Sequence, residues 1–322
     1  MKNRDLPLIL AASLLAAASA AYAAYPERAV RILVPYSPGG NIDITARALA
    51  PGLTEALGQQ VVVDNRPGAG GTIGTELAAK SAPDGYTVLL NSTGALTTAP
   101  ALYPRLGYDP IRDFATTSLV SLVPLVMVTH PSVPARNVKE FIALVKSHPG
   151  RITIASAGVG TTNHLGGELF QSVTGTRMIH VPYKGSGQAL IDVMGGQIDV
   201  MLDQLSSSIG YIQGGKLRAV AVTTLKRSAQ MPEIPTMNES GLPGFDASTV
   251  TGIVLPAATP RDIVMKLHAA LIKVLRLKAT RDSFARFGAE TLESTPEEFA
   301  RFVRNDLAKW SKVIREAGIK LE

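Results

Sequence analysis

Short apolar runs alternate with longer segments of helical periodicity along the chain after residue 25. The run at 30–34 is rich in β-branched residues and ends at Pro35, and residues 42–57 then carry apolar side chains at helical spacing. The same order recurs, with strands expected at 61–63 and 87–90. Near-continuous apolar strands with helices between them predict a parallel sheet that is covered on both faces.

A second set of alternating elements follows the long apolar stretch at 119–128. Residues 226–246 contain Pro232, Pro235 and Pro243 and indicate a connection rather than an element. The chain therefore contains two α/β units. The expected strands of the second unit cover 152–155, 178–181, 199–202 and 217–223, and the expected helices cover 138–147, 164–174, a segment ending at 194, 206–213, 261–277 and the segment from Pro296.

The last two expected helices determine how the units are joined. Both are amphipathic, so we expect them to pack back on the first unit. The chain then crosses between the units twice, which makes a hinge. This places residues 24–124 and 246–322 in domain 1 and residues 125–245 in domain 2. A cleft between hinged α/β domains is where ligands bind, outside the carboxyl ends of the strands.

Three loops are expected to meet in this cleft, at 36–43, 92–93 and 156–163. Each follows a strand and precedes a helix, whose first N–H groups lack an internal partner and can take an anion. Glycines in the two longer loops let the backbone approach a ligand, although they also serve tight turns and helix starts. Neither longer loop contains Lys or Arg. A carboxylate or phosphate would therefore be held by amides, hydroxyls and water.

Three ionisable side chains near these loops have two interpretations each. Asp43 lies in a first helical turn, where it favours the helix dipole and can cap free N–H groups, and we assign it that structural role ahead of a binding one. His164 either donates to an anion or caps its loop. Asp203 either accepts from an amine or hydroxyl of a ligand or caps the following helix.

Residues 1–23 differ from the rest of the chain and predict a secretory signal peptide. Lys2 and Arg4 lead into an Ala/Leu-rich stretch, and Ala21-Tyr22-Ala23 supplies the small-x-small cleavage pattern. An uncleaved membrane anchor is the alternative. It is disfavoured because the stretch contains Pro7 and barely reaches the ~20 residues that span a bilayer. We therefore expect cleavage after Ala23 and a soluble, exported protein.

Composition and the lack of familiar motifs narrow the function. Of 322 residues, 46% are hydrophobic and 18% are charged, as in a globular protein of two domains. The absence of Cys excludes disulfides, thiolate catalysis and zinc ribbons. The formal charge of +6 comes from scattered basic residues, without the aromatic and basic strip that binds nucleic acid.

Enzyme signatures are absent as well. The glycines of 68–74 do not have the G-x-G-x-x-G spacing, and no G-x-S-x-G elbow, Walker A or H-E-x-x-H motif occurs. We therefore expect a protein that is not an enzyme, with no catalytic residue, no metal and no cofactor. The alternative is an exported α/β enzyme that acts on a small carboxylate.

Several segments, in order, resemble the Bug family, the extracytoplasmic receptors of tripartite tricarboxylate transporters. The resemblance covers residues 25–322. The motifs that carry it are YPER at 25–28, VPYSPGGNIDITAR at 34–47, DNRPGAGG at 64–71, APDGYT at 82–87, HVPYKG at 180–185 and GQIDVM at 196–201.

The resemblance implies a two-domain α/β periplasmic binding protein fold, type II-like, with hinged domains and a central cleft. The cleft would take a small mono-, di- or tricarboxylate, or an aromatic acid, partly through water. A periplasmic monomer would deliver this ligand to the membrane subunits of a tripartite tricarboxylate transporter or to a sensor protein, and it would not bind nucleic acid.

The family's binding positions can be carried onto this sequence. Asn41, inside the first binding loop, stands where the family more often has Thr or Ser, which bears on the identity of the ligand and not on its class. The positions are Tyr36, Ser37, Gly39, Gly40, Asp43, Ser92, Ser156, Gly158, Thr161, His164 and Asp203.

Overall fold

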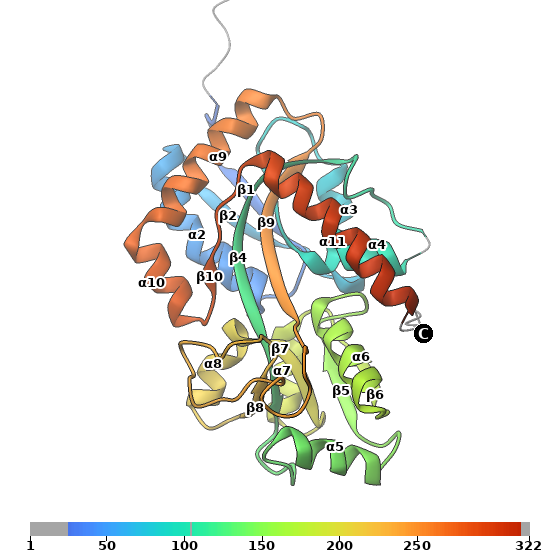
Figure 1. Cartoon of the computed structure of the whole chain (residues 1–322). Helices are drawn as coiled ribbons and strands as arrows, with labels where there is room; N and C mark the ends of the chain where they lie inside the picture. Colours follow the sequence, from blue (N-terminus) through green and yellow to red (C-terminus); the bar gives the residue numbers. More distant parts are fainter. Residues whose placement is uncertain (1–24, 104, 317–322) are drawn as a thin grey trace, which may run out of the picture.

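The computed structural model describes residues 25–103 and 105–316. These residues form two α/β domains, one above the other in Figure 1, which are joined by the long strands β4 (Phe114–Thr129) and β9 (Ser248–Pro256). The predicted signal peptide, residues 1–23, lies outside the described residues. Within the described ranges, no helix is both long enough and apolar enough to cross a membrane.

Domain 1, the upper part of Figure 1, is built on strands in the order β2-β1-β3-β9-β4. β1 (Val30–Val34) pairs in parallel with β2 (Val61–Asn65) and β3 (Thr87–Ser92), whereas β9 runs antiparallel to both β3 and β4. The short strand β10 (Glu290–Thr291) also pairs with β4. The helical elements of this domain are α2 (Asn41–Leu57), η1 (Ala69–Gly71), α3 (Thr72–Ala79), η2 (Gly94–Thr98), α4 (Ala99–Leu102), α9 (Arg261–Arg276), α10 (Lys278–Arg286) and α11 (Pro296–Glu316).

Domain 2 continues from the second half of β4 in the order β4-β7-β5-β6, with β8 also paired to β4. The last residues of β4 leave β9 and pair with β7 from Leu125 onward, next to the pairing of Pro124 with Ser248. The elements of this domain are α5 (Val138–Ser147), β5 (Thr153–Ser156), α6 (Thr162–Thr174), β6 (Ile179–Pro182), α7 (Ser186–Met194), β7 (Val200–Gln204), α8 (Leu205–Gln213) and β8 (Arg218–Val222).

The prediction of a wholly parallel sheet is wrong, because the two strands that join the domains run antiparallel to their neighbours. The outer strands β1, β2 and β3 and the strands β5, β6 and β7 do pair in parallel. A buried strand in either direction is a near-continuous apolar run, so the hydrophobic pattern carries no information on strand direction.

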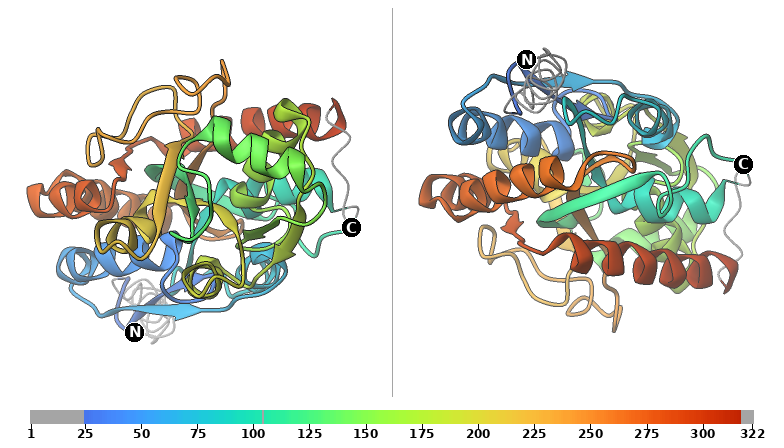
Figure 2. Two further views of the ribbon diagram at one scale, coloured as in Figure 1. Left: turned by 90° about the horizontal axis from the view of Figure 1, so that it is seen from below. Right: turned by 90° about the horizontal axis from the view of Figure 1, so that it is seen from above.

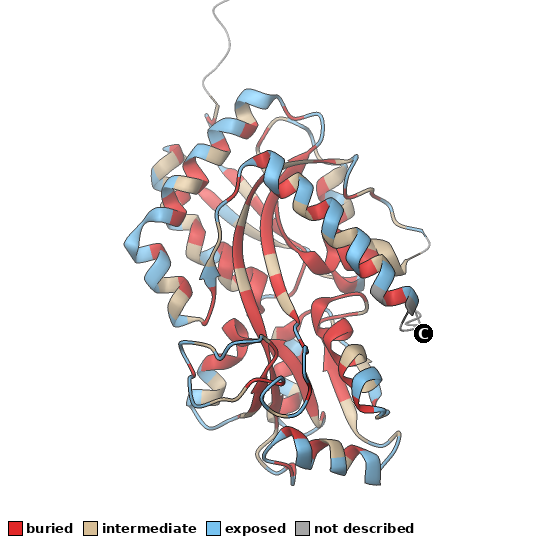
Figure 3. Ribbon diagram, in the orientation of Figure 1, coloured by how far each residue is buried: buried red, intermediate tan, exposed pale blue. Residues whose placement is uncertain are grey.

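Alternating strand residues feed two separate cores in domain 1. Ile32 packs among residues of α2 and α9 on one face, and Leu33 packs with Phe299 of α11 on the other. Seen from above, α9 and α11 lie on either side of β4 (Figure 2), as predicted for a tail that packs back on the first unit. The buried residues concentrate on the strands and the inner helix faces (Figure 3).

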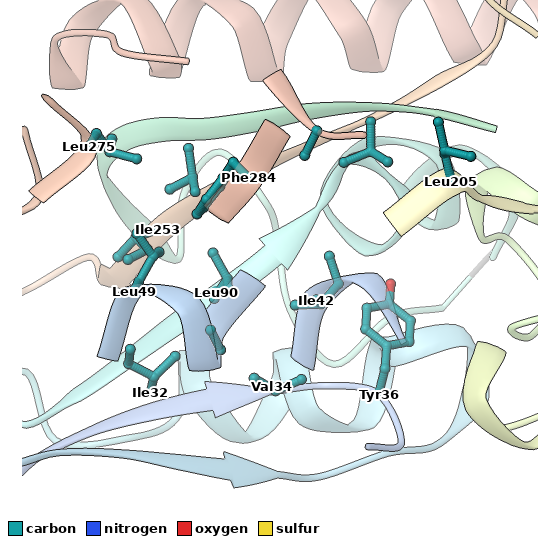
Figure 4. Close-up of a cluster of buried hydrophobic side chains, with 14 of the residues drawn as sticks. Ile32, Val34, Tyr36, Ile42, Leu49, Leu90, Leu205, Ile253, Leu275 and Phe284 are labelled. Atoms are coloured by element: carbon teal, nitrogen blue, oxygen red, sulfur yellow. The ribbon is translucent and has the colours of Figure 1, made fainter. Parts of the chain in front are cut away.

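The larger core also reaches across the domain boundary. Figure 4 shows Leu205 of α8 in the same cluster as Phe284 of α10 and Ile42 of α2. This apolar contact between the domains lies beside the first turn of α2. The two domains are therefore joined by apolar packing as well as by the strands β4 and β9.

Several parts of the fold differ from what the sequence predicted. The strands β9 and β10 and the helical elements η1, η2, α4 and α10 were not predicted. The strand β3 extends to Ser92, so that Asn91 and Ser92 belong to a strand and not to a loop. Gly252 interrupts the apolar pattern in the middle of β9. It is required there because a Cβ would lie 2.3 Å from the ring of Phe299. Because packing against Phe299 requires a glycine at this position, the hydrophobic pattern of the sequence did not indicate the strand β9.

Candidate ligand-binding site

A small cavity lies between the domains, with about 20 Å³ of space for solvent. The three loops predicted to meet in the cleft all contribute to it, together with residues from α7, β7 and β9. It is lined by Tyr36, Gly40, Asn41, Ile42, Ser92, Ala157, Thr161, Thr162, Asn163, Ser186, Gln204 and Thr249.

Four helices of the described chain begin at this cavity. Gly40 is the N-cap of α2, Thr161 that of α6 and Gln204 that of α8, while Ser186 is the first residue of α7. The first N–H groups of a helix have no internal partner and carry the positive end of its dipole. No lining residue is Asp, Glu, Lys, Arg or His. The cavity therefore favours an anion without supplying a counter-charge from a side chain.

The loop before α2 shapes the domain 1 side of the cavity. Gly39 has the left-handed backbone, with φ +82°, whereas Gly40 is extended at φ −86°. The backbone N–H of Gly39 donates to Asp43 Oδ2 at 3.0 Å, and Arg47 and Asn65 also donate to this carboxylate. Burial raises the pKa of Asp43, but these hydrogen bonds outweigh it and hold the pKa below its usual value. Asp43 shapes the loop and does not line the cavity.

Tyr36 and Ser92 form a hydroxyl pair on the cavity wall. Tyr36 OH and Ser92 Oγ are 3.1 Å apart, and both side chains are buried. Burial raises the pKa of Tyr36 to about 12, so the phenol keeps its proton at neutral pH. The pair can donate to an oxygen in the cavity.

The loop before α6 shapes the domain 2 side. Thr161 Oγ1 donates to Gly158 O at 2.6 Å and accepts from the N–H of His164, so the N-cap fixes its own loop. Ser156 lies behind this loop, where its Oγ is 2.7 Å from His180 Nε2 and accepts from the N–H of Gly158. Ser156 and Gly158 support the loop, and Thr161 lines the cavity.

His164 also lies behind the loop. Its Nδ1 accepts from the N–H of Gly160 at 3.3 Å, and its ring stacks on His180 with centroids 4.3 Å apart. Burial, with a further contribution from His180, lowers the pKa of His164 to about 3. The imidazole is therefore neutral. Of its two predicted roles, the geometry displays the capping of the loop.

Asp203 is fully buried beside the cavity but does not line it. Ser207 and Ser208 donate to its Oδ2, and Asn163 Nδ2 donates to its Oδ1 at 3.3 Å. Burial raises the pKa of Asp203 despite these bonds. The carboxyl group is linked to the cavity through hydrogen bonds with two lining residues, Asn163 and Ser186.

A network of amide and hydroxyl groups that was not predicted from the sequence closes the cavity. Gln204 Nε2 donates to Asn163 Oδ1 at 3.2 Å and to Thr249 Oγ1 at 3.0 Å, and Ser186 Oγ donates to Gln204 Oε1 at 3.3 Å. Gln204 directly follows Asp203 at the end of a predicted strand, so its position in the sequence could have identified it as a residue of the cavity. Thr249 had none, because it lies on the unpredicted β9.

The two domains contact each other directly around the cavity. Ser37 donates to the carbonyl of Lys184 from its backbone N–H at 3.2 Å and from its Oγ at 3.0 Å. Thr98 Oγ1 donates to Gly160 O, and Ser206 Oγ of α8 donates to Asn41 Oδ1 at 2.7 Å. These bonds hold the domains together at the cavity through neutral groups.

Among the described residues, no group of three or more His, Asp or Glu side chains is placed to hold a metal ion. The arrangement can instead hold a small anion by hydrogen bonds from neutral donors.

The sequence matches the family described as "Tripartite tricarboxylate transporter family receptor" over residues 45–319. The chain belongs to this receptor family. It is 40% identical to protein BugT of Bordetella pertussis over 299 residues, which is 92% of each chain. The receptors of this family are periplasmic binding proteins and not enzymes.

Solved structures of this receptor class share the fold. The periplasmic binding protein BugD is 38% identical, with a TM-score of 0.90 that covers 92% of this chain and 100% of that one. A Rhodopseudomonas palustris protein solved with adipate is 33% identical, with a TM-score of 0.89 over 92% and 99% of the two chains. MatC of the same species, with bound malate, is 32% identical, with a TM-score of 0.87 over 90% and 100%. The predicted two-domain periplasmic binding protein fold is confirmed.

Proposed function

We propose that this receptor binds a small aliphatic carboxylate, in the range from malate to adipate, in the cavity between its domains. One observation carries the proposal: four helices begin at a cavity whose lining has no ionisable group other than the neutral Tyr36. The chemistry of the lining suits a carboxylate group, because amide N–H and hydroxyl groups can donate to both of its oxygens. The malate and adipate bound by two structural neighbours support this choice.

The predicted binding residues take two kinds of role in this proposal. Tyr36, Gly40, Ser92 and Thr161 line the cavity and contact the carboxylate. Asn163 and Gln204 join them as neutral partners of the acid. The remaining predicted positions act through the residues in contact with the ligand, and they are Ser37, Gly39, Asp43, Ser156, Gly158, His164 and Asp203.

The delivery step follows from the family. The proposed receptor is a periplasmic monomer whose signal peptide is removed after Ala23, with domain limits at 124 and 245, and it passes its acid to transporter membrane subunits or to a sensor protein. The mass of the exported protein gives its first residue, and light scattering after size-exclusion chromatography gives its oligomeric state. A mass that still includes Met1, or a dimer, would contradict the respective part.

Titration calorimetry tests the binding function directly. The mature protein is unfolded, refolded without ligand and titrated with malate, adipate, citrate and benzoate, and arginine serves as the cationic control. We expect malate or adipate to bind and arginine not to bind. Mass spectrometry of small molecules released from natively purified protein identifies the physiological acid. A folded protein that binds neither malate nor adipate would overturn the proposed function.

A further inference from the structure

Asn41 presents an unused hydrogen-bond donor at the cavity. Its side chain is 3% exposed and lines the cavity, and its Nδ2 is buried without a hydrogen-bond partner. Among the described residues, the other buried side-chain atoms without a partner are hydroxyls of Thr117 and Thr129, which do not line it. A buried donor without an acceptor is unfavourable, so its presence at a cavity indicates that a bound molecule supplies the acceptor.

The orientation of the Asn41 amide is fixed from the other domain. Ser206 Oγ, in the first turn of α8, donates to Asn41 Oδ1 at 2.7 Å. Because Ser206 occupies the oxygen, Nδ2 is the polar atom of this cavity-lining side chain that is left to donate to a ligand. Because α2 and α8 belong to different domains, this orientation exists only while the domains are in contact. The donor of Asn41 is therefore oriented only when the two domains are in contact.

We propose that Asn41 determines which acid this receptor takes, by donating from Nδ2 to a carboxylate oxygen while Ser206 holds its Oδ1. The inference rests on the proposed function, since it requires that a carboxylate occupies the cavity. An amide at position 41 extends one bond further than the hydroxyl of a Thr or Ser and occupies more of the cavity. The residue therefore favours the shorter acid, malate, over the longer one, adipate.

The decisive variant is Asn41→Asp, which keeps the shape and the oxygen that accepts from Ser206 but replaces the donor with a negatively charged acceptor. We expect its affinity for malate and for adipate to fall at least about 100-fold relative to the wild type, by calorimetry at neutral pH. The affinities are compared at a temperature where both proteins are folded, because a carboxylate at a position 3% exposed lowers the thermal transition despite the favourable dipole of α2. The control is Asn238→Asp, which makes the same change of charge on an exposed side chain of domain 2, and its affinity should match the wild type.

A second pair of variants tests size and orientation. Asn41→Thr should shift the ratio of the affinities toward adipate by at least about threefold, because it frees space in the cavity. Ser206→Ala should weaken binding about threefold to tenfold in the wild type and less than twofold in the Asn41→Thr background, because Ser206 acts through Asn41. An equal loss in both backgrounds would overturn the orienting role of Ser206.

The outcomes separate this inference from the function on which it rests. If the wild type binds neither acid, the proposed function fails. If the wild type binds malate or adipate and Asn41→Asp binds it equally well, the function stands and the role of Asn41 is refuted. A ratio that Asn41→Thr leaves unchanged would refute the selection by size.

Discussion

The two sides of the cleft each place an aspartate near the anion-binding cavity, and they limit its negative charge in different ways. Each presents a glycine-containing loop and a helix N-terminus to the cavity, and each has an aspartate close behind. On the domain 1 side, Asp43 is ionised and paired with Arg47, whose side chain reaches solvent. On the domain 2 side, Asp203 is fully buried, has no cation among its described partners and has a raised pKa. Both arrangements keep a negative charge off the ligand, the first by pairing it and the second by opposing its formation.

Among variants that compare the two sides of the cleft, the largest expected effect comes from blocking the contact between them. Gly187, in the first turn of α7, faces the carbonyl of Pro38 in domain 1, and a Cβ there would lie 2.3 Å from that oxygen. Gly187→Ala should lower the affinity for malate or adipate at least about 30-fold, because the domains cannot reach their contact, while Ala improves the helix itself.

A matched variant controls this prediction. Gly210→Ala makes the same change inside α8, where a Cβ would meet nothing within 4 Å. Its affinity should equal that of the wild type, and small-angle scattering with saturating malate or adipate should show a more extended particle for Gly187→Ala alone. Unchanged binding by Gly187→Ala would mean that the contact between the domains is dispensable.

Asp43→Asn tests the charged side of the comparison. The variant loses charge-assisted hydrogen bonds from Arg47 and the Gly39 N–H, so we expect the free energy of unfolding at neutral pH to fall by about 1 to 2 kcal/mol. The pKa of Asp43 is lowered in the folded protein, so its stabilisation is present above the ordinary carboxyl pKa and is lost as the pH falls through the lowered pKa. Urea unfolding of both proteins should therefore converge toward acidic pH. If the difference in the free energy of unfolding is the same at all pH values, the charge of Asp43 is not responsible for the loss of stability.

Gly40→Val tests the close approach of the domain 1 loop to the ligand. A Cβ at Gly40 would lie 3.7 Å from Ser186, an ordinary contact, so only the branches of Val crowd the cavity and α7. We expect about a tenfold loss of affinity, equivalent to about 1.4 kcal/mol. Lys184→Ala should change it less than about twofold, because only the backbone carbonyl of Lys184 is used and its side chain is exposed. A larger loss in Lys184→Ala than in Gly40→Val would replace the neutral mechanism with an ion pair.

Asp203→Asn has the smallest expected effect, with the opposite pH dependence. A carboxyl whose pKa is raised on folding destabilises the folded protein as the pH rises above the ordinary value. The amide removes that cost, so the variant should be equal to the wild type in acid and up to about 1 kcal/mol more stable at neutral pH. Thermal unfolding between about pH 4 and pH 7 measures the difference. A variant that is less stable at neutral pH would show that the ionised form is the stabilising one.

The sequence predicted the loops of the site better than the partners behind them. Apolar runs followed by glycines located 36–43 and 156–163, because both strand ends and helix starts leave local signals. The roles of His164 and Asp203 depend on His180 and on the serines of α8, which are distant in sequence or lie on another element. Contacts between side chains of different elements leave no trace in the periodicity of a single sequence.

The positive φ of Gly39, in the loop before α2, is a second feature that the sequence alone does not determine. The glycine pair is evident in the sequence, and the structure assigns the left-handed conformation to Gly39 and not to Gly40. Which of two adjacent glycines takes it depends on the N–H of Gly39 reaching Asp43. The sequence does not show which of the two N–H groups is within hydrogen-bond distance of Asp43.

The position of β9 in the domain 1 sheet, between β3 and β4, has a consequence for the order in which the chain folds. The sheet of domain 1 includes β9, which is synthesised after every strand of domain 2. The N-terminal strands β1, β2 and β3 therefore cannot complete their sheet until residues 248–256 are available. The segment from β5 to β8 is contiguous and can form its pairs earlier, with shorter loops to close. In pulsed hydrogen exchange during refolding, amides of β5 and β7 should gain protection before those of β1 and β3, and the reverse order would contradict this. Until the last quarter of the chain is available, the N-terminal strands of an exported receptor of this kind remain substrates for chaperones and proteases.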